Sequence, residues 1–292
     1  MKNTFHFDTQ IVGIIGHPIK HSYSPFIHNV AIELKKIDYV YLPFDIPSSN
    51  LNSALKGMKA LGIKGFNVTV PHKESVIQYM NSVSEEVSMI GSVNTIVNDQ
   101  GRLIGHNTDA YGVLETLLPF KDDITGNQVC VIGAGGSARA VIYTLIRNFK
   151  PKKLFIVNRN ERRAEYLKEY FSEKMKFSSI KTKELIPPTA FEIMRDSKLV
   201  INATPVGMYP NDTDSITTSA DVFSKEQIVF DLVYNPQSTF LIKTAIKSGA
   251  KTLNGISVLI HQAAKSFELW TGIEFPKEDV QKSLQLYLGN LN

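Results

Sequence analysis

A short glycine-rich segment in the middle of the chain restricts the possible fold more than any other feature. Val129-Cys130-Val131-Ile132 is an apolar run of strand type, and Gly133-Ala134-Gly135-Gly136-Ser137-Ala138 follows it where a helical pattern begins. In such a turn the first glycine permits tight backbone geometry, the second lets a pyrophosphate approach, and the small last residue packs helix on strand. The helix N-terminus attracts phosphate. We therefore predict a dinucleotide site here, with a glycine-rich turn that binds no ligand as the alternative.

Strand-like and helix-like segments alternate along nearly the whole chain, a pattern typical of α/β proteins with mostly parallel sheets. In the second half, strands are predicted at residues 129–132, 154–157, 199–202 and 228–232. In the first half, they are predicted at 12–15, 40–46 and 63–68, followed by a hairpin of 93–97 and 102–106. Because a hairpin is antiparallel, the first sheet is expected to be mixed.

These two series of segments predict two domains. Residues 1–109 are expected to form the mixed-sheet α/β domain, joined by C-terminal helices within about 254–292. Residues 110–253 are expected to form a Rossmann-type domain, with a cleft between the two.

Composition excludes several classes of protein. The formal net charge is +4 and no long basic block occurs, so nucleic acid is not expected as a partner. No apolar run approaches the ~18 residues of a membrane span, and the N-terminus has no secretory pattern. The single cysteine, Cys130, cannot form an internal disulfide and suits a reducing compartment. We expect a cytoplasmic protein without membrane association.

The residues after the second Rossmann strand indicate which dinucleotide would bind. An NAD site usually has an Asp or Glu at this strand tip, because a carboxylate accepts a hydrogen bond from the ribose 2′-hydroxyl. Here the strand ends at Asn158 and Arg159, and Arg163 follows one helical turn later. Guanidinium groups pair well with phosphate, which favours NADP. Surface arginines at the start of a solvated helix are the alternative.

Three short segments of the first half gather polar side chains near strand ends. Ser22 and Ser24 can bind a carboxylate or hydroxyls, although Ser24 before Pro25 also fits a helix N-cap. Lys73 follows a strand at an expected helix start, where a cation opposes the helix dipole, so a functional role competes with that of an exposed lysine. Asn94 lies at the start of the hairpin and Asp109 follows its end, across the hairpin from Asn94; Asp109 also fits an N-cap.

As an ordered set, these segments resemble the shikimate dehydrogenase family, over roughly residues 13 to 265. The resemblance rests on His21-Ser22-Tyr23-Ser24-Pro25, Asn67-Val68-Thr69-Val70-Pro71-His72-Lys73, Val93-Asn94-Thr95, Asn107-Thr108-Asp109, Gly133-Ala134-Gly135-Gly136, Asn158-Arg159, Asn202-Ala203-Thr204 and His261-Gln262-Ala263. Members of the family reduce 3-dehydroshikimate to shikimate with NADPH in aromatic amino acid biosynthesis. The resemblance implies a substrate-binding first domain and the same reaction.

The resemblance also implies a role for individual residues. Lys73 would be the catalytic lysine and Asp109 its carboxylate partner in proton transfer. The substrate carboxylate would be held by Ser22, Ser24 and Tyr234, and its hydroxyls by Thr69, Asn94 and Gln262. NADP would be bound by Gly133, Ala134, Gly135, Gly136, Ser137, Asn158, Arg159, Arg163, Ala203, Thr204 and Gly255.

Other interpretations of the chain stay open. A quinate/shikimate dehydrogenase that uses NAD is the nearest, and kinetics with four substrate–cofactor pairs would separate the two. A methylene-folate dehydrogenase is a second alternative, but the Ser-x-Ser pair and the Lys73/Asp109 combination fit it poorly. A non-catalytic ligand sensor is a third alternative, although a sensor need not keep the Lys73/Asp109 combination. His17, His21 and His28 lack a clustered acidic partner, so no metal is expected. The protein is expected to be a monomer or a homodimer that binds a small molecule.

Overall fold

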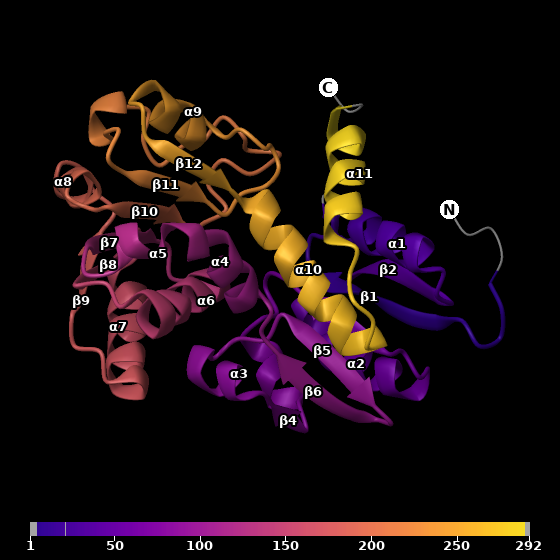
Figure 1. Cartoon of the computed structure of the whole chain (residues 1–292). Helices are drawn as coiled ribbons and strands as arrows, with labels where there is room; N and C mark the ends of the chain where they lie inside the picture. The colour runs from indigo at the N-terminus through magenta and orange to yellow at the C-terminus, as the bar shows by residue number, and fades with distance from the viewer. Residues whose placement is uncertain (1–4, 21, 290–292) are drawn as a thin grey trace. The chain divides into compact units, whose positions relative to one another are not determined.

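The computed structural model describes residues 5–20 and 22–289, which fold into two compact units (Figure 1). One unit comprises the described residues of Met1–Gly112 and Ile260–Asn292, and the other comprises Val113–Leu259. The unit boundaries fall inside two helices, α4 (Asp109–Leu117) and α10 (Gly255–Thr271). Within the described residues, each unit contains one six-stranded sheet.

The sheet of the first unit is mixed, as the hairpin predicted. Its order is β2-β1-β3-β5-β6-β4, with β1 parallel to β2 and β3, β5 antiparallel to β3 and β6, and β4 parallel to β6. The strands are β1 (Gln10–Gly16), β2 (Tyr39–Asp45), β3 (Gly65–Val68), β4 (Ser82–Val83), β5 (Thr95–Asp99) and β6 (Arg102–His106). The hairpin turns at Gln100 and Gly101, whose φ angles of 49° and 85° suit the tight connection.

Apolar residues hold the helices of this unit against its sheet. One buried cluster joins Leu55 and Met58 on α2 to Phe66 and Val68 on β3. On α1, His28 stacks on Tyr41 of β2 at 4.3 Å between ring centroids. The helices are α1 (Ser24–Lys35), α2 (Leu51–Ala60), α3 (Glu85–Ile90) and α11 (Lys277–Gly289), with 3-10 turns η1 (Ser48–Asn50) and η2 (Ser75–Tyr79).

The sheet of the second unit is wholly parallel, in the order β12-β11-β10-β7-β8-β9. The strands are β7 (Gln128–Ile132), β8 (Lys153–Asn158), β9 (Ile180–Glu184), β10 (Leu199–Asn202), β11 (Ile228–Asp231) and β12 (Lys251–Asn254). The strand order reverses between β7 and β10, and in open parallel sheets ligands bind beside the carboxyl ends of strands at such a point. This topology confirms the predicted Rossmann-type fold.

Alternate residues of β7 face two separate cores. Val129 and Val131 pack in the cluster of α6 and α7, whereas Cys130 and Ile132 pack in that of α8 and α9. Burial raises the pKa of the Cys130 thiol to about 12, so it stays protonated. The helices are α5 (Lys121–Ile124), α6 (Gly136–Thr144), α7 (Glu161–Met175), α8 (Thr189–Arg195) and α9 (Phe240–Lys247), with the 3-10 turns η3 (Leu118–Phe120) and η5 (Ala220–Val222) and the π-helical turn η4 (Leu145–Phe149).

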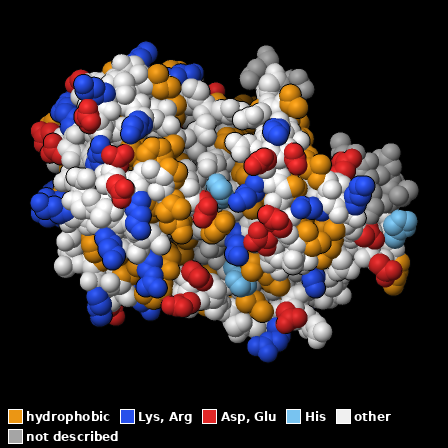
Figure 2. All heavy atoms as spheres, in the orientation of Figure 1, with side chains coloured by type: hydrophobic (Ala, Val, Ile, Leu, Met, Phe, Trp, Pro, Cys, Tyr) orange, Lys and Arg blue, Asp and Glu red, His pale blue; other side chains and the backbone are white. Residues whose placement is uncertain are grey.

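The described part of the chain has no helix that is both long and apolar enough to cross a membrane. On the face shown in Figure 2, cationic and anionic side chains are interspersed.

Candidate active site

Three of the predicted site residues are joined by direct hydrogen bonds in the first unit. Lys73 Nζ donates to Asp109 Oδ2 at 2.5 Å, and Asn94 Nδ2 donates to Asp109 Oδ1 at 2.8 Å. The Lys73 and Asp109 side chains are only 13% and 15% exposed. Because a shielded pair is weakly screened by salt and costly to break, the two charges hold each other in place. The three side chains thus form one polar group with an ammonium and a carboxylate.

Backbone and side-chain bonds anchor the segment that carries Lys73. Thr69 N–H donates to Ile15 O at 2.9 Å, and Val93 N–H donates to Lys73 O at 2.8 Å. The buried His72 ring bonds Ile46 O through Nε2 at 2.6 Å. His72 belongs to the quoted motif, but the sequence assigned it no role. These bonds connect the loop to three neighbouring segments, so the backbone position of Lys73 is fixed.

The expected helix start at Lys73 is wrong. Lys73 lies in a turn, and the 3-10 helix η2 begins two residues later, at Ser75. The segment is held by bonds to neighbouring segments, with no α-helix at its start, so the argument from the helix dipole does not apply. The ion pair with Asp109 explains the buried cation instead.

The alternative role of Asp109 as a helix cap is taken by another residue. Asp109 is the first residue of α4, and the Ala110 N–H donates to Asn107 Oδ1 at 3.1 Å. Asn107 is itself fixed, because its Nδ2 donates to Ser92 O at 2.9 Å. Both Asp109 oxygens bind side chains of the candidate site, Lys73 and Asn94. The carboxylate is therefore held by side chains of the candidate site.

A buried polar network, which the sequence did not reveal, lies behind Asn94. Asn94 Nδ2 is 2.9 Å from Thr108 Oγ1, and Thr108 N–H donates to Asn94 Oδ1 at 2.6 Å. Ser266 Oγ on α10 lies 3.0 Å from Thr108 Oγ1 and 2.8 Å from Thr95 Oγ1. Asn67 Nδ2 donates to Ser266 Oγ at 3.0 Å. Asn67, Thr95 and Thr108 belong to the quoted motifs, but the sequence assigned them no role, and Ser266 lies outside those motifs.

The remaining predicted substrate residues of the first unit are Ser22, Ser24, Thr69 and Gln262. Ser22 Oγ accepts from the Ser24 N–H at 3.2 Å, and Ser24 is buried. Gln262 is buried on α10, and Thr69 follows β3. Among the described residues, no hydrogen bond joins either serine to Lys73, Asp109 or Asn94. Their roles stay predictions.

The N-cap interpretation of Ser24 is wrong. Helix α1 begins at Ser24 itself, its N-cap is Tyr23, and no side chain caps the helix. The amide of Ser24 is satisfied by Ser22 Oγ, so this pair forms a local turn before Pro25. His21, which precedes it in the motif, lies outside the described residues.

The glycine turn of the second unit has the geometry that a dinucleotide requires. Gly133 has φ 116°, a region that favours glycine, and a Cβ there would lie 3.0 Å from Ala203 O. Gly135 is the N-cap of α6, and a Cβ added to it would meet nothing within 4 Å. The backbone of Gly135 is therefore open to an approaching group at a helix N-terminus, which fits a pyrophosphate.

Gly255, at the start of α10, is glycine for a structural reason. A Cβ at this position would lie 2.1 Å from Leu232 O, so any side chain would displace the backbone after β11. Its predicted contact with the cofactor stays a prediction.

The end of β8 presents cations without a carboxylate at the strand tip. Asn158 is the last residue of β8, and its Nδ2 donates to Asn160 O at 2.8 Å. Arg159 is exposed, and Arg163 Nη2 donates to Ala134 O at 3.3 Å, which places this guanidinium against the glycine turn. These positions fit a cofactor phosphate.

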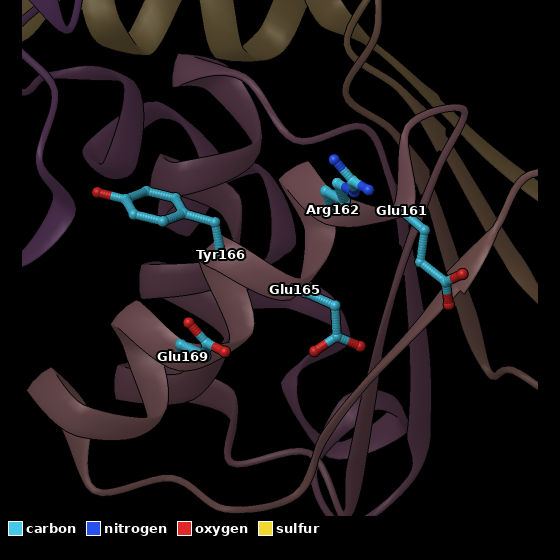
Figure 3. Close-up of a pocket in the computed structure, with 5 residues that line it drawn as sticks. All are labelled: Glu161, Arg162, Glu165, Tyr166 and Glu169. Carbon is cyan, nitrogen blue, oxygen red and sulfur yellow. The ribbon is translucent and has the colours of Figure 1, made fainter.

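The acid that is nearest to this strand tip in the sequence, Glu161, belongs to a different surface. It lies in the first turn of α7, where a carboxylate complements the helix dipole. Figure 3 shows it lining an open hollow along α7 with Arg162, Glu165, Tyr166 and Glu169. Glu165 is bonded there to Lys168 and Thr182. This hollow contains none of the predicted site residues.

A second buried network fixes Thr204, which follows β10. Thr204 N–H and Oγ1 donate to Asn202 Oδ1 at 3.0 and 2.6 Å, and Asn202 Nδ2 donates to Asp231 Oδ1 at 2.9 Å. Thr239 Oγ1 donates to the other Asp231 oxygen at 2.6 Å. Burial raises the pKa of Asp231 to about 6, although these hydrogen bonds oppose the shift. Asp231 was not predicted; half-buried Tyr234 follows three residues later.

The histidines considered as metal ligands occupy separate environments. His17 Nδ1 bonds Asp45 Oδ1 at 2.9 Å at the surface, whereas His28 is fully buried among aromatic rings.

Models of known families match three successive parts of the chain. The model of the shikimate dehydrogenase substrate binding domain matches residues 14–96, and that of shikimate / quinate 5-dehydrogenase matches 117–233. The model of the shikimate 5′-dehydrogenase C-terminal domain matches residues 255–285.

Relatives match over nearly the full length. A shikimate dehydrogenase (NADP(+)) from Caldanaerobacter subterraneus subsp. tengcongensis is 43% identical over 279 residues, which cover 95% of this chain and 97% of the relative. A crystal structure of a shikimate dehydrogenase in complex with NADP+ has a TM-score of 0.89 at 37% identity and covers 98% of each chain. The shikimate 5-dehydrogenase of Listeria monocytogenes in complex with shikimate and NAD has a TM-score of 0.86 at 33% identity, with 97% and 99% covered.

The fold and the site together define the class: an α/β protein with a parallel sheet of the type that binds dinucleotides and a shielded Lys–Asp ion pair. The matches then specify the group within that class: the chain belongs to the shikimate dehydrogenase family, as the ordered motifs had indicated.

Proposed function

We propose that this protein is an NADP-dependent shikimate dehydrogenase that reduces 3-dehydroshikimate to shikimate. The observation that carries the proposal is the bonded set Lys73–Asp109–Asn94, which combines a proton donor with groups that hold it. A sensor needs no such pair. Membership of the family supports both the substrate and the cofactor.

Lys73 is the proton donor in the proposed reduction. NADPH, when bound, supplies the hydride for the ring carbonyl. Negative charge then develops on the carbonyl oxygen, and an ammonium within hydrogen-bonding distance stabilises that charge and donates its proton. In the reverse direction the neutral amine of Lys73 accepts the hydroxyl proton.

Asp109 keeps Lys73 ready for this step. Its Oδ2 accepts from Lys73 Nζ, while Asn94 holds Oδ1, so the carboxylate has little freedom to turn. A fixed carboxylate fixes the ammonium as well, and catalysis depends strongly on such positioning.

The other groups bind the substrate and the cofactor. Following the family resemblance, Ser22, Ser24 and Tyr234 are assigned to the substrate carboxylate, and Thr69, Asn94 and Gln262 to its hydroxyls. Hydroxyl and amide side chains can both form hydrogen bonds with such groups. In the second unit Gly133 to Ser137, Ala203, Thr204 and Gly255 are assigned to the dinucleotide, with Asn158, Arg159 and Arg163 at its 2′-phosphate.

Steady-state kinetics with four substrate–cofactor pairs test this function. Shikimate or quinate is combined with NADP or NAD, and the reduced nicotinamide is followed by its absorbance; reduction of 3-dehydroshikimate is then measured with NADPH. We expect kcat/KM to be highest for shikimate with NADP. Quinate with NAD as the best pair would establish the alternative dehydrogenase, and no turnover with any pair, in a folded protein that binds NADP, would contradict the proposal.

Arg159→Ala is expected to raise the KM for NADP about tenfold with little change for NAD. An exposed charge-assisted bond to phosphate contributes roughly 1–2 kcal/mol, partly screened by salt. Arg162→Ala is the matched control, because this exposed arginine lines the hollow on α7. Equal effects of the two variants, or equal losses for NADP and NAD, would remove Arg159 from the 2′-phosphate site.

A further inference from the structure

Ser266 is the hub of the buried network behind the candidate site. It lies on the part of α10 that belongs to the first unit, and its side chain is completely buried. Its hydroxyl is within hydrogen-bonding distance of Asn67 on β3, Thr95 on β5 and Thr108 before α4. It also donates to Gln262 O, one turn earlier on its own helix, at 3.0 Å. One hydroxyl thus connects three segments of the sheet region to the helix that carries Gln262.

The hydrogens of this network can be arranged in one consistent direction. Asn94 Nδ2 donates to Thr108 Oγ1 at 2.9 Å, Thr108 Oγ1 donates to Ser266 Oγ at 3.0 Å, and Ser266 Oγ donates to Gln262 O. Asn94 Nδ2 uses its second hydrogen on Asp109 Oδ1. In this arrangement Thr108 accepts one bond and donates one, whereas Ser266 accepts from both Thr108 and Asn67 Nδ2 and donates to Gln262 O, which uses the one donor and two acceptor sites of a hydroxyl. The chain therefore runs without interruption from Asp109 to the backbone of Gln262.

We propose that Ser266 is a positioning residue, which acts through Asn94 and Gln262 to set the distance between the groups that hold the substrate hydroxyls. The inference rests on the proposed function, because it assigns both residues to the substrate. Ser266 itself is buried and touches neither substrate nor cofactor. Its effect on turnover is transmitted by Thr108 to Asn94 and by the helix turn to Gln262.

Ser266→Ala is the variant that removes the hub while keeping the fold. Asn67 Nδ2 keeps Thr95 Oγ1 at 3.1 Å and Asn94 O at 3.3 Å as acceptors, so no buried amide loses all its partners. Gln262 O is a main-chain carbonyl oxygen within a helix, so it depends less on a side-chain donor than an isolated buried carbonyl does. Alanine also favours helix.

We expect Ser266→Ala to lower kcat/KM for shikimate about tenfold while the KM for NADP changes less than about twofold. Ser197→Ala is the matched control: Ser197 Oγ is also buried and donates to the carbonyl four residues earlier, Ile193 O, at 2.7 Å, but it lies in the second unit. A purely structural loss would lower the unfolding temperature in both variants and leave kcat/KM for shikimate, measured well below that temperature, unchanged in both.

A double-mutant cycle separates positioning from general damage. If Ser266 acts through Gln262, adding Ser266→Ala to Gln262→Ala lowers kcat/KM further by less than about threefold, because the residues act as one unit. Full additivity overturns the proposal. If Ser266→Ala yields no folded protein, Thr108→Val removes the link from Ser266 to Asn94 with almost unchanged side-chain shape. An unchanged kcat/KM for shikimate in that variant overturns the proposal as well.

The activity of the wild-type protein separates a failure of the positioning role from a failure of the proposed function. An active wild type whose Ser266→Ala variant behaves like Ser197→Ala refutes the positioning role and leaves the proposed function in place. An inactive wild type refutes the proposed function, and the positioning role with it.

Discussion

Lys73→Ala is expected to lower kcat for shikimate oxidation by about 10²- to 10⁴-fold, the range that general acid–base groups contribute. The variant loses the group that takes the hydroxyl proton and the cation that stabilises charge on that oxygen. Binding of NADP, assigned to the second unit, should survive. The measurement is steady-state kinetics beside a titration of NADP binding.

Removing one partner of a shielded ion pair also affects the fold. Asp109 keeps its bond from Asn94 and is 15% exposed, so the cost is expected to be below the roughly 3–5 kcal/mol of a fully buried pair. Thermal unfolding of Lys73→Ala therefore has to accompany the kinetics. Lys198→Ala is the control, since Lys198 is 24% exposed and paired with Asp123 at 3.4 Å in the second unit. Its kcat should stay within about twofold.

Asp109→Asn supplies a second line of evidence on the same pair. Because Lys73 and Asp109 act together, the double variant should be little worse than the more damaged single variant. A Lys73→Ala enzyme that keeps kcat within tenfold of wild type, with chemistry limiting, would show that the proton is handled elsewhere.

The central strands and the glycine turn could be predicted because their signals lie in contiguous residues. β7, β8, β10 and β11 are apolar runs inside a sheet covered on both faces, and such strands must be hydrophobic throughout. β9 and β12 were missed because they are the edges of the same sheet. In β9 only Ile180 and Thr182 are buried, alternating with exposed lysines, so its sequence resembles a polar loop.

The site was predictable only in part, because its parts are distant in the sequence. Lys73 and Asp109 are 36 residues apart, and no local periodicity connects them. Only the resemblance to the family's motifs indicated that the two residues act together. Ser266 lies 171 residues from Thr95, and in the sequence it is one small polar residue in a helix. Small hydroxyls in helices commonly bond their own backbone, so the pattern gave no reason to single it out.

The wrong expectations at Ser24 and Lys73 have a common cause. Both were assigned from helix-end preferences, which describe the local chain and ignore its neighbours. In the structure Ser24 is buried inside the first turn of α1, and Lys73 is held by an ion pair with Asp109. At Lys73 a tertiary ion pair decided the position, whereas at Ser24 the helix begins one residue earlier than the cap preference predicts.

His28 makes the stability of the protein sensitive to acid in an unusual way. Its ring lies parallel to Tyr41 within 3°, and Trp270 lies 5.4 Å away between centroids. Neither ring nitrogen has a hydrogen-bond partner among the described residues. Burial lowers the pKa of His28 to about 3, with the nearby Asn67 side chain opposing the shift. The folded protein therefore keeps this ring neutral well below neutral pH.

The sign of the effect follows from proton binding. In the unfolded chain the His28 ring, with its ordinary pKa of 6.5, binds a proton below that pH, whereas in the folded state it stays neutral down to about pH 3. Stability from this group is thus complete above pH 6.5 and falls by about 1.4 kcal/mol per unit as the pH decreases below it. Between pH 7 and pH 4 the loss is about 3 kcal/mol.

His28→Phe is expected to remove this loss, because phenylalanine fills the same stack and binds no proton. Urea unfolding at pH 7 and pH 4 should show the free energy of unfolding decreasing by about 3 kcal/mol less in the variant than in wild type. His6→Asn is the control, since His6 is exposed, and it should keep the wild-type difference. Equal pH dependence of wild type and His28→Phe would mean that the buried ring takes up a proton in the folded state, and that some other group causes the acid sensitivity.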